Sequence, residues 1–230
     1  MKTSQENVVG GQMARRSFLK FASAGAMAAG VVATAASCKK REYVDDDHVD
    51  LGSGDIAILN YAYALEQLEA AFYTQVAANF YANISSEERA LLTDIRDHEI
   101  SHRELFKAAL SSSAIPALTP NFSSIDFNNR NSVLSAAKAF EDLGVAAYNG
   151  AGAMIKSADY LTLAGKIVSV EARHAATVRN LLQFNSFVDN TIVDIANTSL
   201  EKSKTPQEVV PIANTFLTGK KIAAPSLGIY

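Results

Sequence analysis

The amino-acid sequence predicts an all-α fold in which four helices form a bundle. From Asp55 onward, apolar residues recur at spacings of three and four, which is the periodicity of amphipathic helices. No stretch of this part alternates apolar and polar residues over a sustained length, as half-buried strands do. The lengths of the polar connections indicate two antiparallel helical hairpins joined by one long crossover.

Polar and helix-capping residues separate the expected helices. Asp55 is the expected N-cap of the first helix, Ser85 or Ser86 begins the second, and Asn131 or Ser132 begins the third. The four helices are expected at about 55–79, 86–111, 132–157 and 160–184. The links within each pair are short, which makes the paired helices antiparallel neighbours.

Two longer polar segments complete this part of the chain. Residues 112–130, which contain Pro116 and Pro120, are long enough to cross the length of a bundle. A bundle of residues 55–185 with such a crossover has the ferritin-like connectivity. Residues 186–230 form a mostly irregular C-terminal extension that we expect to pack on the bundle.

The first 37 residues have the pattern of an export signal. Arg15 and Arg16 begin a twin-arginine motif, and a run of small and apolar residues follows from Phe21 to Ala36. This run is shorter than the ~20 residues that a membrane-spanning helix needs. We therefore expect residues 1–37 to be a twin-arginine signal peptide that is read by the Tat translocase.

Cys38 directly follows this signal and is the only cysteine in the chain. A cysteine after small residues resembles a bacterial lipobox, whose cysteine is lipidated, so we expect a membrane anchor at Cys38 and a place in the cell envelope or periplasm. Ala35 stands where a lipobox usually has a large aliphatic residue. The alternative is a soluble exported protein with a free thiol. We expect residues 38–54 to form a flexible tether, because this segment is rich in charged residues and glycine.

The composition excludes several classes of protein. The chain is 48% hydrophobic and 20% charged, as globular proteins are. A single cysteine excludes a disulfide framework and a cysteine-rich zinc site. The net charge of −3 argues against nucleic-acid binding, which needs a basic surface.

The residues that carry chemistry lie on the predicted helices. The second helix contains Glu99-x-x-His102, and the fourth contains Glu171-x-x-His174. Residues three apart share one helical face, so each pair can direct a carboxylate and an imidazole at one point.

The first and third helices each offer one carboxylate in an apolar setting, Glu66 and Glu141. An unpaired buried carboxylate costs several kcal/mol or more, and a cation removes that penalty. Tyr73 and Tyr148 follow the two carboxylates two helical turns later, and we expect them to form hydrogen bonds with ligand carboxylates. The hairpins therefore repeat each other, and together they supply four carboxylates and two imidazoles. This set suits a pair of Fe or Mn ions.

Three other residues compete for a place in this site. Glu69 lies one turn from Glu66 and is an alternative ligand, but its counterpart in the repeat is Gly144, which favours Glu66. His98 is about 100° around the helix from the motif, and we expect it to be exposed rather than ligating. His48 falls in the predicted tether.

These motifs resemble the ferritin-like superfamily with a di-iron carboxylate site, over about residues 55–185. The run from Leu65 to Tyr73 resembles exported ferritin-like domain proteins, some of which are called desiccation-related. The resemblance implies that Glu99 and Glu171 bridge two Fe or Mn ions. It implies the following ligands: Glu66, Glu99, His102, Glu141, Glu171 and His174.

The resemblance also implies a function, which is oxidation of Fe(II) or reduction of peroxide or oxygen in envelope stress protection. The alternative is a metal-containing envelope protein without catalysis, with a structural or interaction role. A third hypothesis is a purely structural bundle whose Glu side chains are solvated. The sequence has no Cys-x-x-Cys pair and hence no rubredoxin-type electron-transfer domain.

Overall fold

The computed structural model describes residues 46–230, so the predicted signal peptide, Cys38 and the first part of the tether lie outside the described residues. The predicted all-α bundle is confirmed. The long helices are α2 (Gly54–Ala78), α3 (Ser86–Leu110), α4 (Arg130–Gly152) and α5 (Ala158–Leu182). The other elements are α6 (Pro206–Thr215), β1 (His48–Asp50), β2 (Lys221–Ala223) and the 3₁₀ turns η1 (Ser111–Ser113) and η2 (Pro225–Leu227). Within residues 46–230, no helix combines the length and the apolar character that crossing a membrane requires.

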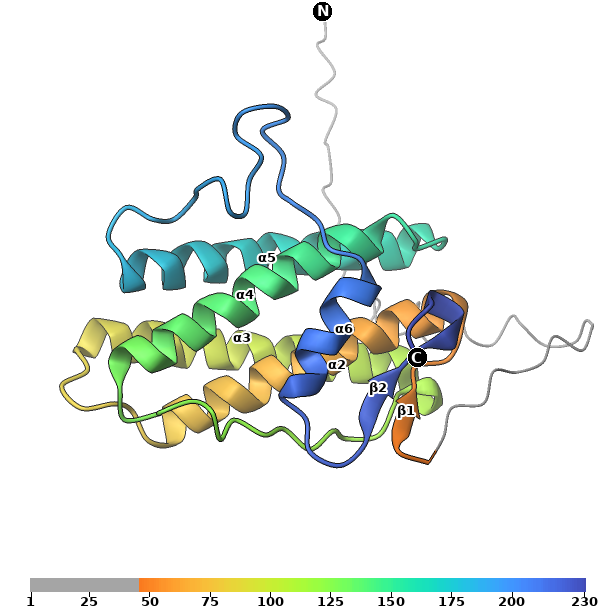
Figure 1. Cartoon of the computed structure of the whole chain (residues 1–230), viewed down its shortest axis with the longest axis horizontal. Coiled ribbons are helices and arrows are strands. Elements are labelled where there is room, and N and C mark those ends of the chain that lie inside the picture. Colours follow the sequence, from red (N-terminus) through yellow and green to blue (C-terminus); the bar gives the residue numbers. More distant parts are fainter. Residues whose placement is uncertain (1–45) are drawn as a thin grey trace, which may run out of the picture. The chain divides into compact units, whose positions relative to one another are not determined.

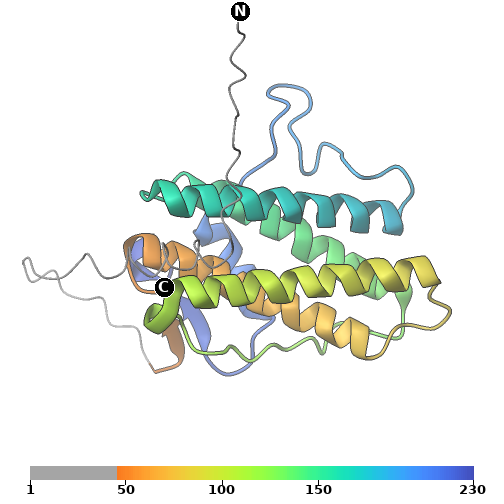
Figure 2. The same cartoon turned by 180° about the vertical axis from the view of Figure 1, so that it is seen from behind.

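The bundle consists of two helical hairpins, as the connection lengths predict. Helix α2 packs along α3, and α4 packs along α5 (Figure 1). The chain between η1 and α4 runs the length of the bundle before the second hairpin begins, which the view from behind also shows (Figure 2). This long crossover gives the ferritin-like connectivity rather than a simple up-and-down order.

Three helices begin with a side chain that closes the first turn. Ser85 accepts a hydrogen bond from the Glu88 N–H, which confirms it as the N-cap of α3. Asn129 caps α4, and Ser157 caps α5. The third helix thus begins slightly earlier than expected, and it ends at Gly152 rather than near Ser157.

The expected N-cap at Asp55 is wrong, because Ser53 occupies that position. The Asp55 carboxylate instead accepts hydrogen bonds from the backbone N–H groups of Lys156 (3.0 Å) and Ser157 (2.8 Å). It therefore holds the turn between α4 and α5 against the start of α2. This long-range role cannot be read from local sequence.

The predicted tether is wrong for residues 48–54. His48–Asp50 forms β1, which pairs in parallel with β2 near the C-terminus. Val49 and Leu51 are buried, with 7% and 0% of their surface exposed. These two apolar side chains lie among charged and glycine residues, so the composition of the segment concealed them. The described start of the chain is thereby joined to the C-terminal extension.

The C-terminal extension packs on the first hairpin and on α4. Helix α6 contacts α2 and α4, and Thr205 with Glu208 forms a capping box at its start. The chain before α6 approaches α4 closely, since the Lys204 N–H donates to the Ala146 carbonyl at 2.9 Å. Gly150 permits this approach, because a Cβ at that position would lie 1.9 Å from the Lys204 carbonyl oxygen.

The cover provided by α3, α4 and α6 explains why α2 is buried on most of its surface. Residues from both sides of α2 are inaccessible, including Glu66 (0% exposed) and Glu69 (3% exposed). One side of the bundle holds an aromatic cluster in which Phe72 packs against Phe122 and Phe140 at centroid distances of 5.8 and 5.1 Å. The polar residues of α2 therefore lie in a water-poor interior.

Candidate metal centre

Six polar side chains from the four long helices converge in the bundle. They form two groups, and within each group the ligand atoms lie within 4.8 Å of one another. The first group is Glu66, Glu99, His102 and Glu171, and the second is Glu99, Glu141, Glu171 and His174. Glu99 and Glu171 belong to both groups. The structure thus brings together all six residues that the sequence motifs single out.

The two Glu-x-x-His motifs face each other across α3 and α5. His102 Nδ1 lies 2.6 Å from a carboxylate oxygen of Glu171, and His174 Nδ1 lies 2.7 Å from one of Glu99. Each histidine therefore contacts the glutamate of the opposite motif more closely than that of its own. The helical repeat places both imidazoles on the inner faces of their helices.

The lone carboxylates approach from the other two helices. Glu66 Oε2 lies 3.7 Å from His102 Nδ1, and Glu141 Oε2 lies 3.7 Å from His174 Nδ1. Each half of the centre thus has one carboxylate and one imidazole of its own, and the two halves share Glu99 and Glu171.

Within residues 46–230, the converging ligand atoms of this cluster have polar contacts only with one another. The four carboxylates have at most 1% of their side-chain surface exposed. The following atoms are buried and have no hydrogen-bond partner outside the cluster: Glu66 Oε2, Glu99 Oε1 and Oε2, His102 Nδ1, Glu141 Oε2, Glu171 Oε1 and Oε2, and His174 Nδ1. Buried polar atoms are normally satisfied, so six carboxylate oxygens and two imidazole nitrogens that converge without outside partners are suited to binding a cation. The residues present therefore could hold metal through carboxylate and imidazole ligands.

The pKa shifts of the clustered carboxyl groups also indicate that this cluster needs positive charge nearby. Burial raises the pKa of Glu66 and of Glu141 well above the usual range, and the carboxylates of Glu99 and Glu171 raise both further. Burial also opposes ionisation of Glu99, but the contacts with His102 and His174 outweigh it and lower the Glu99 pKa to about 2. Without a cation, the cluster therefore depends on protons to limit the repulsion among its carboxylates.

The two histidines hold those protons. Burial lowers the pKa of His102 and of His174, but contacts with Glu171 and Glu99 prevail and raise the two values to about 9 and about 10. A metal ligand must present an unprotonated nitrogen, so a bound cation displaces these protons.

Two tyrosines orient the lone carboxylates, each from the opposite hairpin. The Tyr73 hydroxyl on α2 donates to Glu141 Oε1 on α4 at 2.6 Å, and the Tyr148 hydroxyl on α4 donates to Glu66 Oε1 on α2. In both carboxylates, Oε1 is occupied by a tyrosine while Oε2 faces the cluster without a partner. Such hydrogen bonds fix the orientation of ligand carboxylates.

Glu69 is buried but belongs to neither group of converging ligands. Its Oε1 lies 2.8 Å from the position that a Cβ on Gly144 would occupy. The side chain of Glu69 therefore fills the space that its counterpart in the repeat leaves empty. The repeat thus pairs a large residue with a small one at this crossing of α2 and α4.

His98 is exposed and outside both groups, but it is not separate from the centre. Its Nδ1 lies 2.9 Å from Nε2 of His174. Sequence reasoning missed this contact, because it considered only the helix face of the motif. The available signal was the histidine directly before Glu99, a position where the second motif has Val170.

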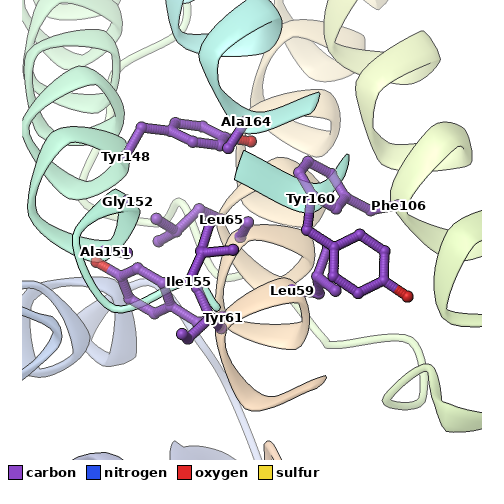
Figure 3. A pocket seen from close by; sticks show the side chains of 12 residues that line it. Leu59, Tyr61, Leu65, Phe106, Tyr148, Ala151, Gly152, Ile155, Tyr160 and Ala164 are labelled. Carbon is purple, nitrogen blue, oxygen red and sulfur yellow. The ribbon is translucent and has the colours of Figure 1, made fainter. Parts of the chain in front are cut away.

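Tyr148, whose hydroxyl donates to Glu66, also lines a small apolar cavity (Figure 3). Its volume is about 20 Å³, and its lining includes Leu65, Phe106, Tyr148 and Tyr160. Tyr148 therefore has the cavity on one side and the Glu66 carboxylate as its hydrogen-bond partner. A space of this size admits a molecule about as large as water.

The fold and the site define a helical-bundle protein with a buried cluster of carboxylates and imidazoles. The model of the family described as "Ferritin-like domain" matches residues 54–184, which covers the four long helices. The chain therefore belongs to the ferritin-like domain family. No curated protein matches it.

Proposed function

We propose that this chain binds two Fe or Mn ions in the candidate metal centre and uses them to oxidise Fe(II) or to reduce peroxide or oxygen. The observation that carries the proposal is the convergence of eight buried ligand atoms from six side chains, none of which has a hydrogen-bond partner outside the cluster within residues 46–230. Carboxylate and imidazole ligands suit both metals, which supply one-electron redox chemistry when bound.

The protein's own residues have distinct tasks in this proposal. Glu99 and Glu171 belong to both groups, so they would be ligands shared by the two ions. Tyr73 and Tyr148 hold one oxygen of Glu141 and of Glu66, which leaves the second oxygen of each for the centre. The ligands are thereby positioned before an ion enters, which lowers the ordering cost of binding.

The surroundings of the centre favour a small oxidant. The cavity beside Tyr148 holds about 20 Å³, which is too little for a bulky organic substrate. His102 has 12% of its side-chain surface exposed and is the most accessible of the six proposed ligands. Dioxygen, peroxide and Fe(II) are all small enough for such a site.

The test of this function is a comparison of iron-loaded protein with free iron. We expect the protein to oxidise added Fe(II), or to consume peroxide, faster than the same amount of free ion, because a bound site holds the reactants in position. Glu171→Gln should abolish the gain, whereas Glu69→Gln, a buried position outside the ligand groups, should retain it. Equal rates for protein and free ion, with metal still bound, would instead favour the non-catalytic envelope role.

We also propose that the chain is exported through a twin-arginine signal at residues 1–37 and anchored to the membrane at Cys38. A buried centre gives a physical reason for export after folding. Metal chosen in the cytoplasm would be protected from competition by Cu or Zn outside, because exchange from the bundle interior requires local opening.

The export proposal predicts where a signal variant accumulates. Changing both Arg15 and Arg16 to Lys should leave the precursor in the cytoplasm, folded and loaded with metal. Arg41→Lys, which lies beyond the signal, should be exported as the wild type is. Cell fractionation with elemental analysis of each fraction measures both outcomes. Normal export of the double variant would rule out the twin-arginine route.

A further inference from the structure

The two halves of the candidate metal centre differ at one position. The residue before Glu99 is His98, whereas the residue before Glu171 is Val170. His98 Nδ1 lies 2.9 Å from His174 Nε2, and the two rings are nearly parallel, with an interplanar angle of 15° and centroids 5.1 Å apart. Valine offers no such nitrogen to His102. Within residues 46–230, the structure records no hydrogen bond to His102 Nε2.

This contact determines which nitrogen of His174 carries a proton when a metal is bound. His174 directs Nδ1 at the cluster, 2.7 Å from Glu99. A neutral histidine that gives its Nδ1 lone pair to a metal holds its proton on Nε2. The Nε2–H of His174 then donates to Nδ1 of His98, so the ring of His174 is fixed in the ligating tautomer and orientation.

We propose that His98 is a positioning residue that makes the two metal positions unequal. The position formed with His174 binds its ion more tightly than the position formed with His102. This inference rests on the proposed dinuclear centre. A partner that holds the second nitrogen of a ligand histidine typically contributes about 10- to 100-fold in metal affinity. The exposed fractions agree with this order, because 12% of the His102 side chain is exposed and only 5% of the His174 side chain.

The test is an anaerobic titration of the metal-free full chain with Co(II). Visible absorption monitors the binding, and a chelator that competes for Co(II) brings both affinities into the measurable range. We expect two binding steps whose affinities differ by about tenfold or more. His98→Ala should weaken the tighter step by about 10- to 100-fold and should leave the weaker step within about twofold. Because His98 is exposed, this variant should fold as the wild type does.

Two control variants separate positioning from a general structural effect. His98→Asn keeps an acceptor near the place of Nδ1 and should recover most of the lost affinity. Val170→Ala, at the equivalent position of the other motif, should change neither step. A paramagnetically shifted N–H signal from one ligand histidine should exchange slowly with solvent in the wild type and rapidly in His98→Ala.

The possible failures are distinguishable. Equal binding steps in the wild type, or loss of the weaker step in His98→Ala, would overturn the role of His98 while leaving the dinuclear centre in place. If the wild type binds no Co(II), Fe(II) or Mn(II), the proposed centre itself fails, and the inference fails with it.

Discussion

Replacing both shared carboxylates, Glu99→Gln with Glu171→Gln, should remove nearly all of the metal from the purified protein. The wild type is expected to carry about two Fe or Mn ions per chain, the number for which a ligand set of this type is built. Each of the two glutamates belongs to both ligand groups, so their loss weakens both metal positions at once. Elemental analysis of protein folded in the cytoplasm measures the content directly.

The controls for this experiment follow from the structure. Glutamine has nearly the shape of glutamate, so the double variant should keep the packing of the interior while losing two negative charges. Glu69→Gln makes the same change at a buried position outside both groups, and it should retain the full metal content. Full retention of metal in the double variant would reject the assigned ligands.

Local patterns were sufficient to predict the four long helices and the residues of the cluster. Helical periodicity and polar caps gave the approximate ends of the helices, since both signals act over a few residues. The internal repeat placed Glu66 and Glu141 opposite the two Glu-x-x-His motifs. A repeated pattern is informative because it constrains several helices at once, whereas a single motif constrains only one.

The features that sequence reasoning missed depend on contacts between distant segments. Strand β1 exists because β2, near the opposite end of the sequence, pairs with it, and three residues are too short to give a strand pattern. Asp55 caps a turn on another hairpin rather than its own helix. His98 lies beside the motif on α3, and only the packing of α5 brings it to His174. Tertiary packing, which local propensity does not contain, decides all three.

Removing the metal should lower the stability of the wild type strongly. A ligand that binds only the native state stabilises it by about 2.7 kcal/mol at 100 times its Kd and by about 4.1 kcal/mol at 1,000 times its Kd. The metal-free protein must also keep four carboxylates together in a buried cluster. Thermal unfolding with and without a chelator should therefore show a clearly lower Tm for the metal-free form. Identical melting curves would contradict a metal centre in the core.

Glu141→Gln should leave the stability of the metal-free protein nearly unchanged but remove much of the stabilisation that metal gives. Burial raises the pKa of Glu141 well above its usual range, which favours the neutral form of this carboxyl when no cation is bound. An amide of the same shape can replace a protonated carboxyl at little cost, and its oxygen can still accept the hydrogen bond from Tyr73. The metal-free variant should consequently melt close to the metal-free wild type. Its gain from added metal should be much smaller, because the amide is a poor ligand for Fe or Mn, whereas Glu69→Gln should keep the full gain.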